Sequence, residues 1–214
     1  METRGDTKKE SNKYLWITGI ILIVFLIAVI TNGFGIFNNP YPKAINLTIG
    51  NSPVLGSLDS KTTIYIFSDF SCSYCAIFAT QTIPQVIENY VNTEKVKIVF
   101  KYFPTHSQAE AAHKVAFCLN QQNLFWQFHD LAFSNQKDLN DIKNVKSLAI
   151  SLGANSTKLD SCLSSTDFNA EFQKDIAIAK ANNLRGTPSI AINDRIYEGA
   201  LSYQEIKTLL DKIV

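Results

Sequence analysis

The sequence has little net charge, few histidines and few cysteines. Its 214 residues contain 20 lysines and arginines, 19 aspartates and glutamates, 3 histidines and 4 cysteines, and the net charge at pH 7 is +1. This balance argues against a nucleic-acid-binding protein, because such proteins carry strongly basic surfaces. The sequence also has no internal repeat and no low-complexity segment. Its length suits one domain, or one domain with an insertion.

An apolar segment without charge lies near the N-terminus, over residues 14–30. It is at the short end for a transmembrane helix and somewhat long for the core of a cleaved signal peptide. Residues 28–35 contain no Ala-x-Ala cleavage site, although Gly-Phe-Gly at residues 33–35 would serve as a poor one. We therefore favour an uncleaved anchor over residues 14–32.

The basic residues around this segment predict its orientation. Lys8, Lys9 and Lys13 precede it, and the next basic residue is Lys43. Since the basic flank of an anchor stays in the cytoplasm, we expect residues 1–13 to form a cytoplasmic tail. The rest of the chain would then lie outside the cytoplasmic membrane, on its periplasmic or extracellular side. Disulfide bonds persist there, because such compartments are oxidising.

A Cys-x-x-Cys pair, Cys72 and Cys75, follows a short apolar run that begins at Thr62. The run is rich in β-branched and aromatic residues and predicts a buried strand, and a helix-like segment follows the pair. Such a pair forms an exchangeable disulfide or supplies half of a zinc site. Zinc would need two more ligands at matching spacing, but Cys118 and Cys162 stand alone. We therefore favour redox chemistry and expect no metal site.

The order of strand, Cys-x-x-Cys and helix indicates how the two sulfurs would differ. Cys72 would lie at the helix N-terminus, where unpaired backbone N–H groups and the helix dipole favour a thiolate over a thiol. Cys75, one turn later, would lie beneath it and be less exposed. Cys72 is then the attacking sulfur and Cys75 the resolving one.

Several stretches resemble the DsbA-like thiol-disulfide oxidoreductases, which have a thioredoxin fold with a helical insertion. The most specific is Phe-Ser-Asp-Phe-Ser-Cys-Ser-Tyr-Cys at residues 67–75, which follows Pro-Val-Leu-Gly at residues 53–56. The resemblance continues through residues 109–133 and 186–210. It implies an α/β protein with a thioredoxin-like fold and an all-α helical insertion. The anchor expected from the uncharged segment would precede this fold as an N-terminal transmembrane helix.

The hydrophobic periodicity agrees with this fold. The expected elements are a strand from residue 62, a helix after residue 75 that is bent at Pro84, a strand over 96–103, helices over 107–120, 124–135, 142–152 and 167–182, strands over 189–192 and 195–198, and a final helix capped by Ser202. Residues 45–49 are a possible edge strand. Ser107 with Glu110 predicts a capping box, and Gly153 predicts a helix C-cap.

These elements divide the chain into five parts. They are a cytoplasmic tail (1–13), an anchor (14–32), a linker with an N-terminal edge segment (33–59), a thioredoxin-like core (60–106 with 185–214) and a helical insertion (107–184).

The resemblance also implies further site residues. Thr187 and Pro188 would form a cis peptide bond that faces the cysteines, and the exposed backbone of Thr187 would pair with an extended substrate chain. Thr187 would also tune the redox pair, as would Ser73 and Tyr74 between the cysteines. Strongly oxidising relatives have Pro-His between their cysteines. The absence of an imidazole here predicts a less extreme oxidant.

One position departs from the family pattern. Many relatives have a buried acidic residue six positions before the first cysteine, where it accepts the proton of the resolving cysteine, but this chain has Ile66 there. Proton transfer at Cys75 would then use water or another group. Asp69 is the nearest acid in the sequence, and we interpret it as a turn or helix-start carboxylate in preference to a proton relay.

The other cysteines and the histidines have alternative interpretations. Cys118 and Cys162 are either free buried thiols, since cysteine packs as a small apolar residue, or a structural disulfide, as in some relatives. An oxidising compartment and the even count favour the disulfide, which would stabilise the fold by roughly 3–4 kcal/mol. His106, His113 and His129 show no spacing that requires a metal.

The predicted function is that of a protein-disulfide oxidoreductase. It would introduce disulfide bonds into unfolded or reduced exported proteins at Cys72 and Cys75, without a bound cofactor, as a monomer anchored in the cytoplasmic membrane. A membrane-embedded partner would reoxidise it. The first alternative is an outward-facing reductase, or an isomerase, although residues 38–60 are too short for the dimerisation domain of known isomerases. The second is a peptide-binding assembly module.

Overall fold

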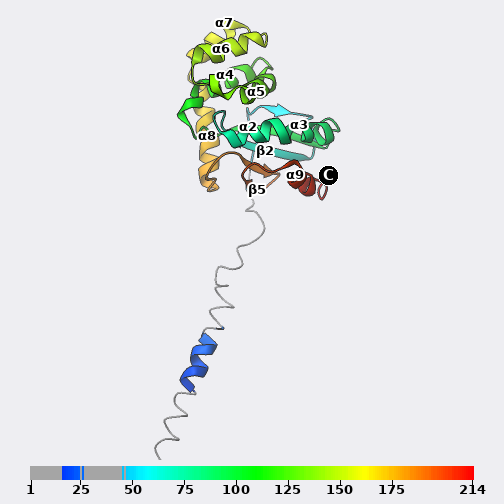
Figure 1. Cartoon of the computed structure of the whole chain (residues 1–214), viewed down its shortest axis with the longest axis vertical. Helices are drawn as coiled ribbons and strands as arrows, with labels where there is room; N and C mark the ends of the chain where they lie inside the picture. The colour runs from blue at the N-terminus through cyan, green and yellow to red at the C-terminus, as the bar shows by residue number, and fades with distance from the viewer. Residues whose placement is uncertain (1–15, 25, 27–44, 46) are drawn as a thin grey trace, which may run out of the picture. The chain divides into compact units, whose positions relative to one another are not determined.

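The computed structural model describes residues 16–24, 26, 45 and 47–214 (Figure 1), and the chain divides into two units, Met1–Pro42 and Lys43–Val214. In the first unit, residues 16–24 are helical and their apolar side chains are exposed. Within the described ranges, none of the helices is both long and apolar enough to span a lipid bilayer. The predicted tail and part of the predicted anchor over residues 14–32 lie outside these ranges.

A five-stranded sheet forms the centre of the second unit. Its strands are β1 (Val54–Leu55), β2 (Thr62–Ser68), β3 (Val96–Tyr102), β4 (Ser189–Ile192) and β5 (Arg195–Glu198). Their spatial order is β1-β3-β2-β4-β5, with β2 and β3 parallel and the other neighbours antiparallel. Every residue of β2, β3 and β4 is buried. This explains why β2 is a continuous run of apolar and hydroxyl residues, without a polar face.

The possible edge strand over residues 45–49 is not formed by the described residues 45 and 47–49. Instead, the backbone N–H of Ile45 donates a single hydrogen bond to the carbonyl of Asp194 (2.7 Å). The side chains of Ile45, Leu47 and Ile49 pack with apolar residues of the sheet. The segment is therefore held by side-chain burial, and β1 takes the edge position.

A long helical stretch follows the cysteine motif and covers one face of the sheet. It consists of α2 (Ser73–Ile77), η2 (Phe78–Thr82), α3 (Ile83–Val86) and η3 (Ile87–Val91). The prediction of one helix that continues through Pro84 is confirmed. Proline has no N–H to donate to the preceding turn, and the hydrogen bonding is π-helical in η2 and η3, on either side of α3.

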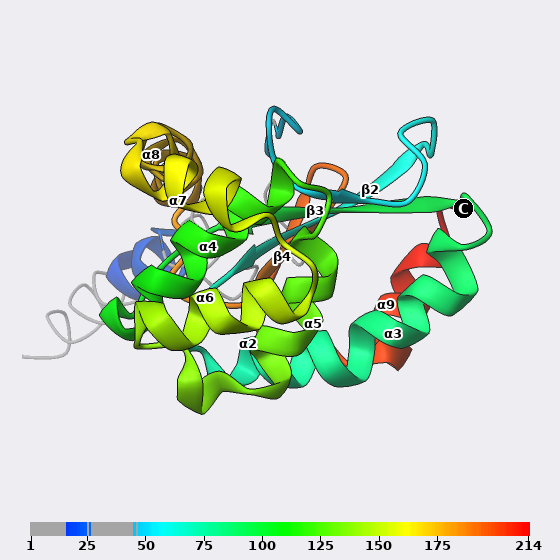
Figure 2. The same ribbon diagram turned by 90° about the horizontal axis from the view of Figure 1, so that it is seen from above.

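The C-terminal helix α9 (Tyr203–Leu210) packs beside α3 on the same face of the sheet (Figure 2). Its predicted cap is confirmed, because Ser202 and Glu205 form a reciprocal capping box. The core beneath these two helices is made by β-branched and aliphatic side chains from the sheet and both helices, namely Ile64, Ile66, Ile83, Val86, Ile206 and Leu210.

The chain between β3 and β4 is helical, as predicted. Its segments are η4 (Ser107–Ala109), α4 (Glu110–Asn120), α5 (Phe125–Ser134), η5 (Gln136–Asp138), α6 (Ile142–Ser151), α7 (Ser156–Ser164) and α8 (Asp167–Ala181). Helix α7 was not predicted, because it buries only Leu159 and its sequence is mostly polar. The side chain of Asn155 caps it by accepting a hydrogen bond from the N–H of Lys158 (2.9 Å).

Two predicted helix ends in this insertion had different outcomes. The prediction of a capping box by Ser107 and Glu110 is wrong, because residues 107–109 form a 3₁₀ turn and Ala109 is the N-cap of α4. Glu110 instead pairs with Lys114, one turn along α4. The prediction for Gly153 is confirmed, since this residue follows α6 with a φ of +87°, a conformation that glycine adopts without strain.

Aromatic packing joins the insertion to the turn after β2. The ring of Phe70 stacks on Phe100 of β3 (centroids 5.5 Å apart) and on Phe133 of α5 (4.9 Å). Phe128 of α5 contacts the same ring edge-on (5.8 Å). Because Phe70 lies two residues before Cys72 and is fully buried, these contacts fix the start of the cysteine motif.

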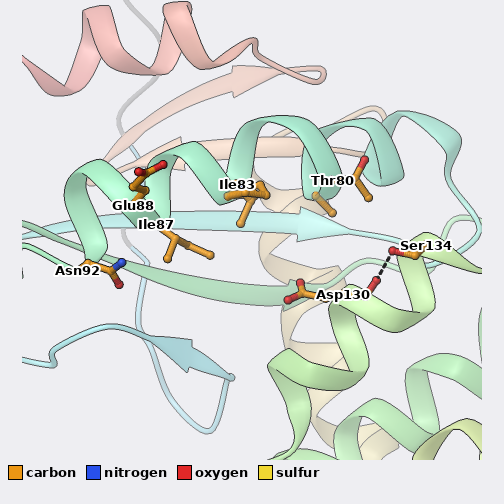
Figure 3. A pocket seen from close by; sticks show the side chains of 9 residues that line it. Thr80, Ile83, Ile87, Glu88, Asn92, Asp130 and Ser134 are labelled. Atoms are coloured by element: carbon orange, nitrogen blue, oxygen red, sulfur yellow. Dashed lines mark hydrogen bonds between the residues drawn. The ribbon is translucent and has the colours of Figure 1, made fainter.

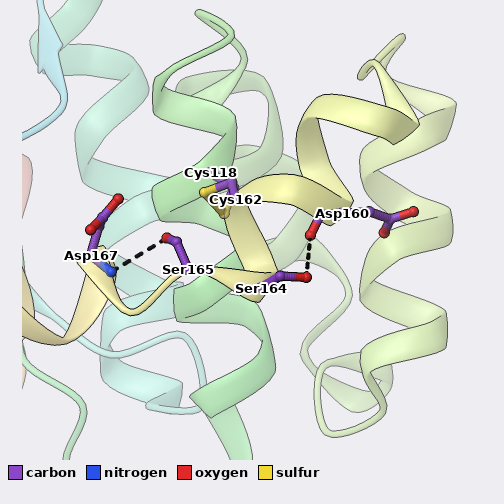
Figure 4. The surroundings of a disulfide bond; sticks show 6 residues. All are labelled: Cys118, Asp160, Cys162, Ser164, Ser165 and Asp167. Carbon is purple, nitrogen blue, oxygen red and sulfur yellow. Dashed lines mark hydrogen bonds between the residues drawn. A yellow bond between two sulfur atoms is a disulfide. The ribbon is translucent and has the colours of Figure 1, made fainter.

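Cys118 of α4 and Cys162 of α7 are joined by a disulfide bond, with their Cα atoms 5.7 Å apart (Figure 4).

A buried ion pair joins the insertion to the sheet, on the face opposite to α3 and α9. Helix α8 buries Asp175 against Lys101 of β3, and the distance from Lys101 Nζ to Asp175 Oδ1 is 3.1 Å. Asp175 Oδ2 also accepts the backbone N–H of Tyr102 (2.8 Å). This buried ion pair ties the last insertion helix to the central sheet.

Candidate active site

The two free cysteines lie where β2 passes into α2. A tight turn follows β2, in which the N–H of Cys72 donates to the carbonyl of Asp69 (3.0 Å), and Cys72 is then the N-cap of α2. Cys72 retains slight exposure, whereas Cys75 is almost fully buried one turn later. The structure therefore brings the two sulfurs together with the unequal exposure that the sequence predicts.

The two thiols differ strongly in acidity. The pKa of Cys72 is lowered to about 5, mainly by a hydrogen bond from the Cys75 thiol, with further hydrogen bonds from Thr187 and from the backbone N–H groups of Tyr74 and Cys75. These outweigh burial, which acts in the opposite direction. Burial raises the pKa of Cys75 far above its ordinary value, and the Cys72 sulfur raises it further. At neutral pH the pair is therefore a Cys72 thiolate beside a Cys75 thiol.

The loop before β4 faces the Cys72 sulfur. The Thr187–Pro188 peptide bond is cis, and the Cys72 Sγ lies 3.1 Å from the carbonyl oxygen of Thr187. Pro188 is buried, whereas Thr187 is half-buried. The hydroxyl of Ser189, the first residue of β4, donates to the carbonyl of Gly186 (2.7 Å) and closes this loop.

The two residues between the cysteines point outward. Ser73 is exposed, and 64% of the Tyr74 surface is accessible to solvent. Of the two, Tyr74 lowers the Cys72 pKa, and it does so through its backbone N–H in the first helical turn and not through its side chain. The exposed Tyr74 ring is therefore available at the rim of the site.

The structure also shows what surrounds Cys75 in place of an acid. Ile66 is buried in the apolar core between the sheet and α3. Ser68, two residues later on β2, forms a hydrogen bond that acts to lower the pKa of Cys75, against the larger effect of burial. Sequence reasoning missed Ser68. The signal was available, because residues two apart on a strand point to the same face, and Ile66 occupies the position at which relatives have an acid beside the resolving cysteine.

Asp69 is the most highly connected side chain of the site and is fully buried. Its Oδ1 accepts the N–H of Ser71 (2.9 Å), and its Oδ2 accepts the N–H and the hydroxyl of Thr105 (2.7 and 2.9 Å) and the N–H of His106 (2.8 Å). His113 Nε2 lies 3.5 Å from Oδ1. Burial acts to raise the pKa of Asp69, but these donors and His113 hold it well below its ordinary value.

A glutamine of the insertion reaches the cysteine motif. The side-chain amide of Gln136 donates to the carbonyls of Phe70 (2.8 Å) and Cys72 (2.9 Å). Sequence reasoning also missed this residue, which no local pattern marks. Together with the Phe70 ring, it makes the insertion part of the support of the motif.

The histidines do not converge. His106 is about half exposed and its Nδ1 lies 2.8 Å from Asp69 Oδ2, whereas His129 is buried and pairs with Asp130 (2.8 Å). Across the described part of the chain, no group of three or more histidine, cysteine or acidic residues is placed to hold a metal ion.

A groove of about 500 Å³ runs along the helical stretch that follows the motif (Figure 3). Ile83 and Ile87 supply its apolar wall, and Asp130 and Ser134 of α5 lie opposite. Glu88 adds a second carboxylate. The groove begins at Ala79, one turn beyond Cys75, so a chain bound there would lie beside the reactive pair and not on it.

Comparison with known proteins agrees with this site. The family model described as Thioredoxin matches residues 48–212. Disulfide bond formation protein D of Bacillus subtilis is 26% identical over 173 residues, which are 77% of this chain and 78% of that protein. A putative protein-disulfide oxidoreductase of Rickettsia conorii is 26% identical over 191 residues, which cover 81% of this chain and 65% of that one.

Solved structures show the same fold. The crystal structure of oxidised BdbD from Bacillus subtilis superposes with a TM-score of 0.72 at 24% identity, and covers 80% of this chain and 97% of that one. That of DsbA from Chlamydia trachomatis gives a TM-score of 0.69 at 17% identity, with coverages of 81% and 97%. The chain therefore belongs to the thioredoxin family, as a DsbA-like protein-disulfide oxidoreductase.

Proposed function

We propose that this protein introduces disulfide bonds into exported proteins by thiol-disulfide exchange at Cys72-Ser73-Tyr74-Cys75. The observation that carries the proposal is the split between the two thiols, with a Cys72 pKa of about 5 and a Cys75 pKa raised by burial. A stabilised Cys72 thiolate favours the reduced form of the pair. A pair with a stabilised reduced form is a stronger oxidant and donates its disulfide to other thiols.

The reaction has two exchange steps and moves two electrons from substrate to enzyme. A substrate thiolate attacks Cys72 Sγ of the oxidised pair, the Cys72–Cys75 bond breaks, and the Cys75 sulfur leaves and takes up a proton. A second substrate thiolate then attacks the substrate sulfur of the mixed disulfide. The substrate disulfide forms, and Cys72 leaves as a thiolate. No bound cofactor is needed.

The remaining site residues have supporting roles in this proposal. The half-buried Thr187 would present its backbone to an extended substrate chain, beside a Pro188 that has no N–H to face the sulfurs. Ser73 and Tyr74, which are exposed, would contact the substrate and tune the pair through the first helical turn. Proton transfer at Cys75 would pass through Ser68 or water.

We also propose that the enzyme works at the outer side of the cytoplasmic membrane, tethered by an anchor over residues 14–32. The uncharged segment and the basic residues before it support this orientation. The Cys118–Cys162 bond supports an oxidising compartment, where it would be a structural disulfide. Anchoring would hold the enzyme in one plane with a membrane-embedded reoxidising partner and so raise their effective concentration.

The test is the reduction potential of the pair. Residues 43–214 with Cys118 and Cys162 replaced by alanine are equilibrated in glutathione buffers, so that only Cys72 and Cys75 report. A value between about −120 and −180 mV supports disulfide donation. A value at or below about −250 mV, as in thioredoxin, would make this an outward-facing reductase and overturn the proposal. A Cys72→Ser variant that kept full biological function would favour the binding module.

A further inference from the structure

We propose that Asp69 and Thr105 are positioning residues, which hold Thr187 against Cys72 through a chain of hydrogen bonds and so place the edge on which a substrate peptide docks. The inference rests on the proposed function, since it assumes that peptides dock at Thr187. It concerns three segments that are distant in the sequence. These are the motif turn (residues 69–72), the loop after β3 (residues 103–106) and the cis-proline loop (residues 186–188).

The chain begins at the Asp69 carboxylate, inside the motif turn. One of its oxygens accepts the N–H of Ser71 (2.9 Å), next to the reactive cysteine. Its other oxygen accepts both the N–H and the hydroxyl of Thr105 (2.7 and 2.9 Å). A fully buried carboxylate is costly unless it is bonded in this way, so the two loops it joins are held at a fixed separation.

The chain continues from Thr105 to Thr187. A threonine hydroxyl has one proton and two lone pairs. Because Thr105 gives its proton to Asp69, its oxygen is left as an acceptor, 3.4 Å from the hydroxyl of Thr187. The single proton of that hydroxyl is shared between Thr105 and the Cys72 sulfur, whose pKa it lowers. The carbonyl of the same Thr187 is 3.1 Å from Cys72 Sγ. One carboxylate thus reaches both the motif turn and the residue that faces the sulfur.

The same contacts argue against a proton-relay role for Asp69. Both of its oxygens are occupied by donors, and the donors hold its pKa well below the ordinary range, which makes it a poor proton acceptor. The sulfur is reached by Thr187 and not by the carboxylate. Asp69 is therefore a turn carboxylate, as interpreted from the sequence, and its turn is bonded to the loop after β3 and to the cis-proline loop.

The decisive variant is Thr105→Val in the full chain. Thr105 is exposed, so this change removes the bridging hydroxyl, keeps the side-chain shape and leaves the core untouched. Two rates are compared: reduction of the oxidised protein by a cysteine-containing decapeptide, and by N-acetylcysteine amide, which has no chain to dock. We expect the peptide-to-small-thiol ratio to fall about three- to fivefold, the effect of one net hydrogen bond. Thr105→Ser, which keeps the hydroxyl, should restore it.

A second readout does not depend on catalysis. Amide hydrogen exchange of Gly186 and Thr187, measured by mass spectrometry on the reduced protein, should become faster in Thr105→Val and not in Thr105→Ser. Asp69→Asn should speed this exchange and lower the rate ratio further, because it also weakens the bonds to Ser71 and His106. The matched control is Asp175→Asn, which alters a carboxylate as buried as Asp69 that contacts Lys101 and Tyr102 instead. It should lower stability without changing the ratio.

The outcomes separate this inference from the proposed function. A wild-type chain that exchanges with the peptide, while Thr105→Val keeps the wild-type rate ratio and the wild-type amide exchange rate, would overturn the inference alone. Equal losses of ratio in Asp69→Asn and Asp175→Asn would also overturn it, since general destabilisation would then explain both. A wild-type chain that oxidises neither thiol would overturn the proposed function and this inference together.

Discussion

The two cysteine pairs of this protein are built in opposite ways. Cys72 and Cys75 are close in sequence, lie at the junction of β2 and α2, and are free thiols of very different acidity. Cys118 and Cys162 are 44 residues apart and form a disulfide between two insertion helices. The comparison teaches that the surroundings decide the use of a cysteine pair. A helix start and hydrogen bonds from the Cys75 thiol and the Thr187 side chain make one pair reactive, and helix packing makes the other a cross-link.

The largest expected effect comes from removing the attacking sulfur. Cys72→Ser should reduce disulfide exchange to the uncatalysed rate, because a serine hydroxyl is not ionised at neutral pH and forms no mixed disulfide. The measurement is oxidation of a dithiol peptide. Replacing both Cys118 and Cys162 by alanine is the matched control and should leave exchange in place. Loss of exchange in that control alone would reverse the assignment of the two pairs.

Removing the second pair should affect stability instead. Cys118→Ala with Cys162→Ala should lower the free energy of unfolding by roughly 3–4 kcal/mol, since the disulfide closes a loop of 44 residues in the unfolded chain. Urea unfolding followed by circular dichroism measures this change. The alkylation midpoint of Cys72 should stay near pH 5 in the same variant. A decrease in the free energy of unfolding of less than about 1 kcal/mol would show that the disulfide bond adds little to the packing of the two helices.

The first pair should make stability depend on both pH and redox state. Because the folded pKa of Cys72 is depressed to about 5, its stabilisation of the reduced protein is fully present above the unfolded pKa of about 8.5. It is lost as the pH falls through about 5. The oxidised protein has no thiol to titrate, so its stability should lack this dependence. Urea unfolding of both forms from pH 9 to pH 4 measures the difference.

The pH dependence of Cys72 alkylation has a control in the same site. The Cys75 thiol is the largest cause of the lowered Cys72 pKa, so Cys75→Ala should move the alkylation midpoint of Cys72 toward its ordinary value. An unchanged midpoint would assign the low pKa to the helix start and Thr187 alone.

The smallest expected effect concerns Ser68. Its hydrogen bond lowers the pKa of Cys75 against burial, so Ser68→Ala should reduce the thiolate fraction of Cys75 and slow its attack on a mixed disulfide at Cys72. We expect release of glutathione from that mixed disulfide to slow about two- to fivefold, the effect of one net hydrogen bond. Ser68→Thr, which keeps a hydroxyl, is the control. Equal slowing in both variants would indicate a packing effect.

Sequence reasoning succeeded where a signal is local. The buried run of β2, the Cys-x-x-Cys spacing and the helix after it follow from residues that are neighbours in the chain, and so do the caps at Ser202 and Gly153. It failed at α7, a mostly polar helix with a single buried residue, and at residues 45–49, where side-chain packing replaced strand pairing. In both cases tertiary contacts outweighed local pattern.

The supports of the site could not be predicted for a related reason. Asp69 and Thr105 are 36 residues apart, Cys72 and Gln136 are 64 apart, and Cys72 and Thr187 are 115 apart. Nothing in the composition of those segments marks the partners. The approach of Thr187 to the cysteines was expected only through the family resemblance.

The sequence by itself determined the reactive pair, its place at a strand–helix junction and the difference in exposure between its sulfurs. These follow from helix geometry and from the unpaired N–H groups of a first helical turn. Only the tertiary structure decided how far the two pKa values separate, which carbonyl faces Cys72 and which carboxylate binds the motif turn and the loop after β3. Burial and hydrogen bonding depend on every segment packed around a group, and the fold assembles those segments from distant parts of the chain.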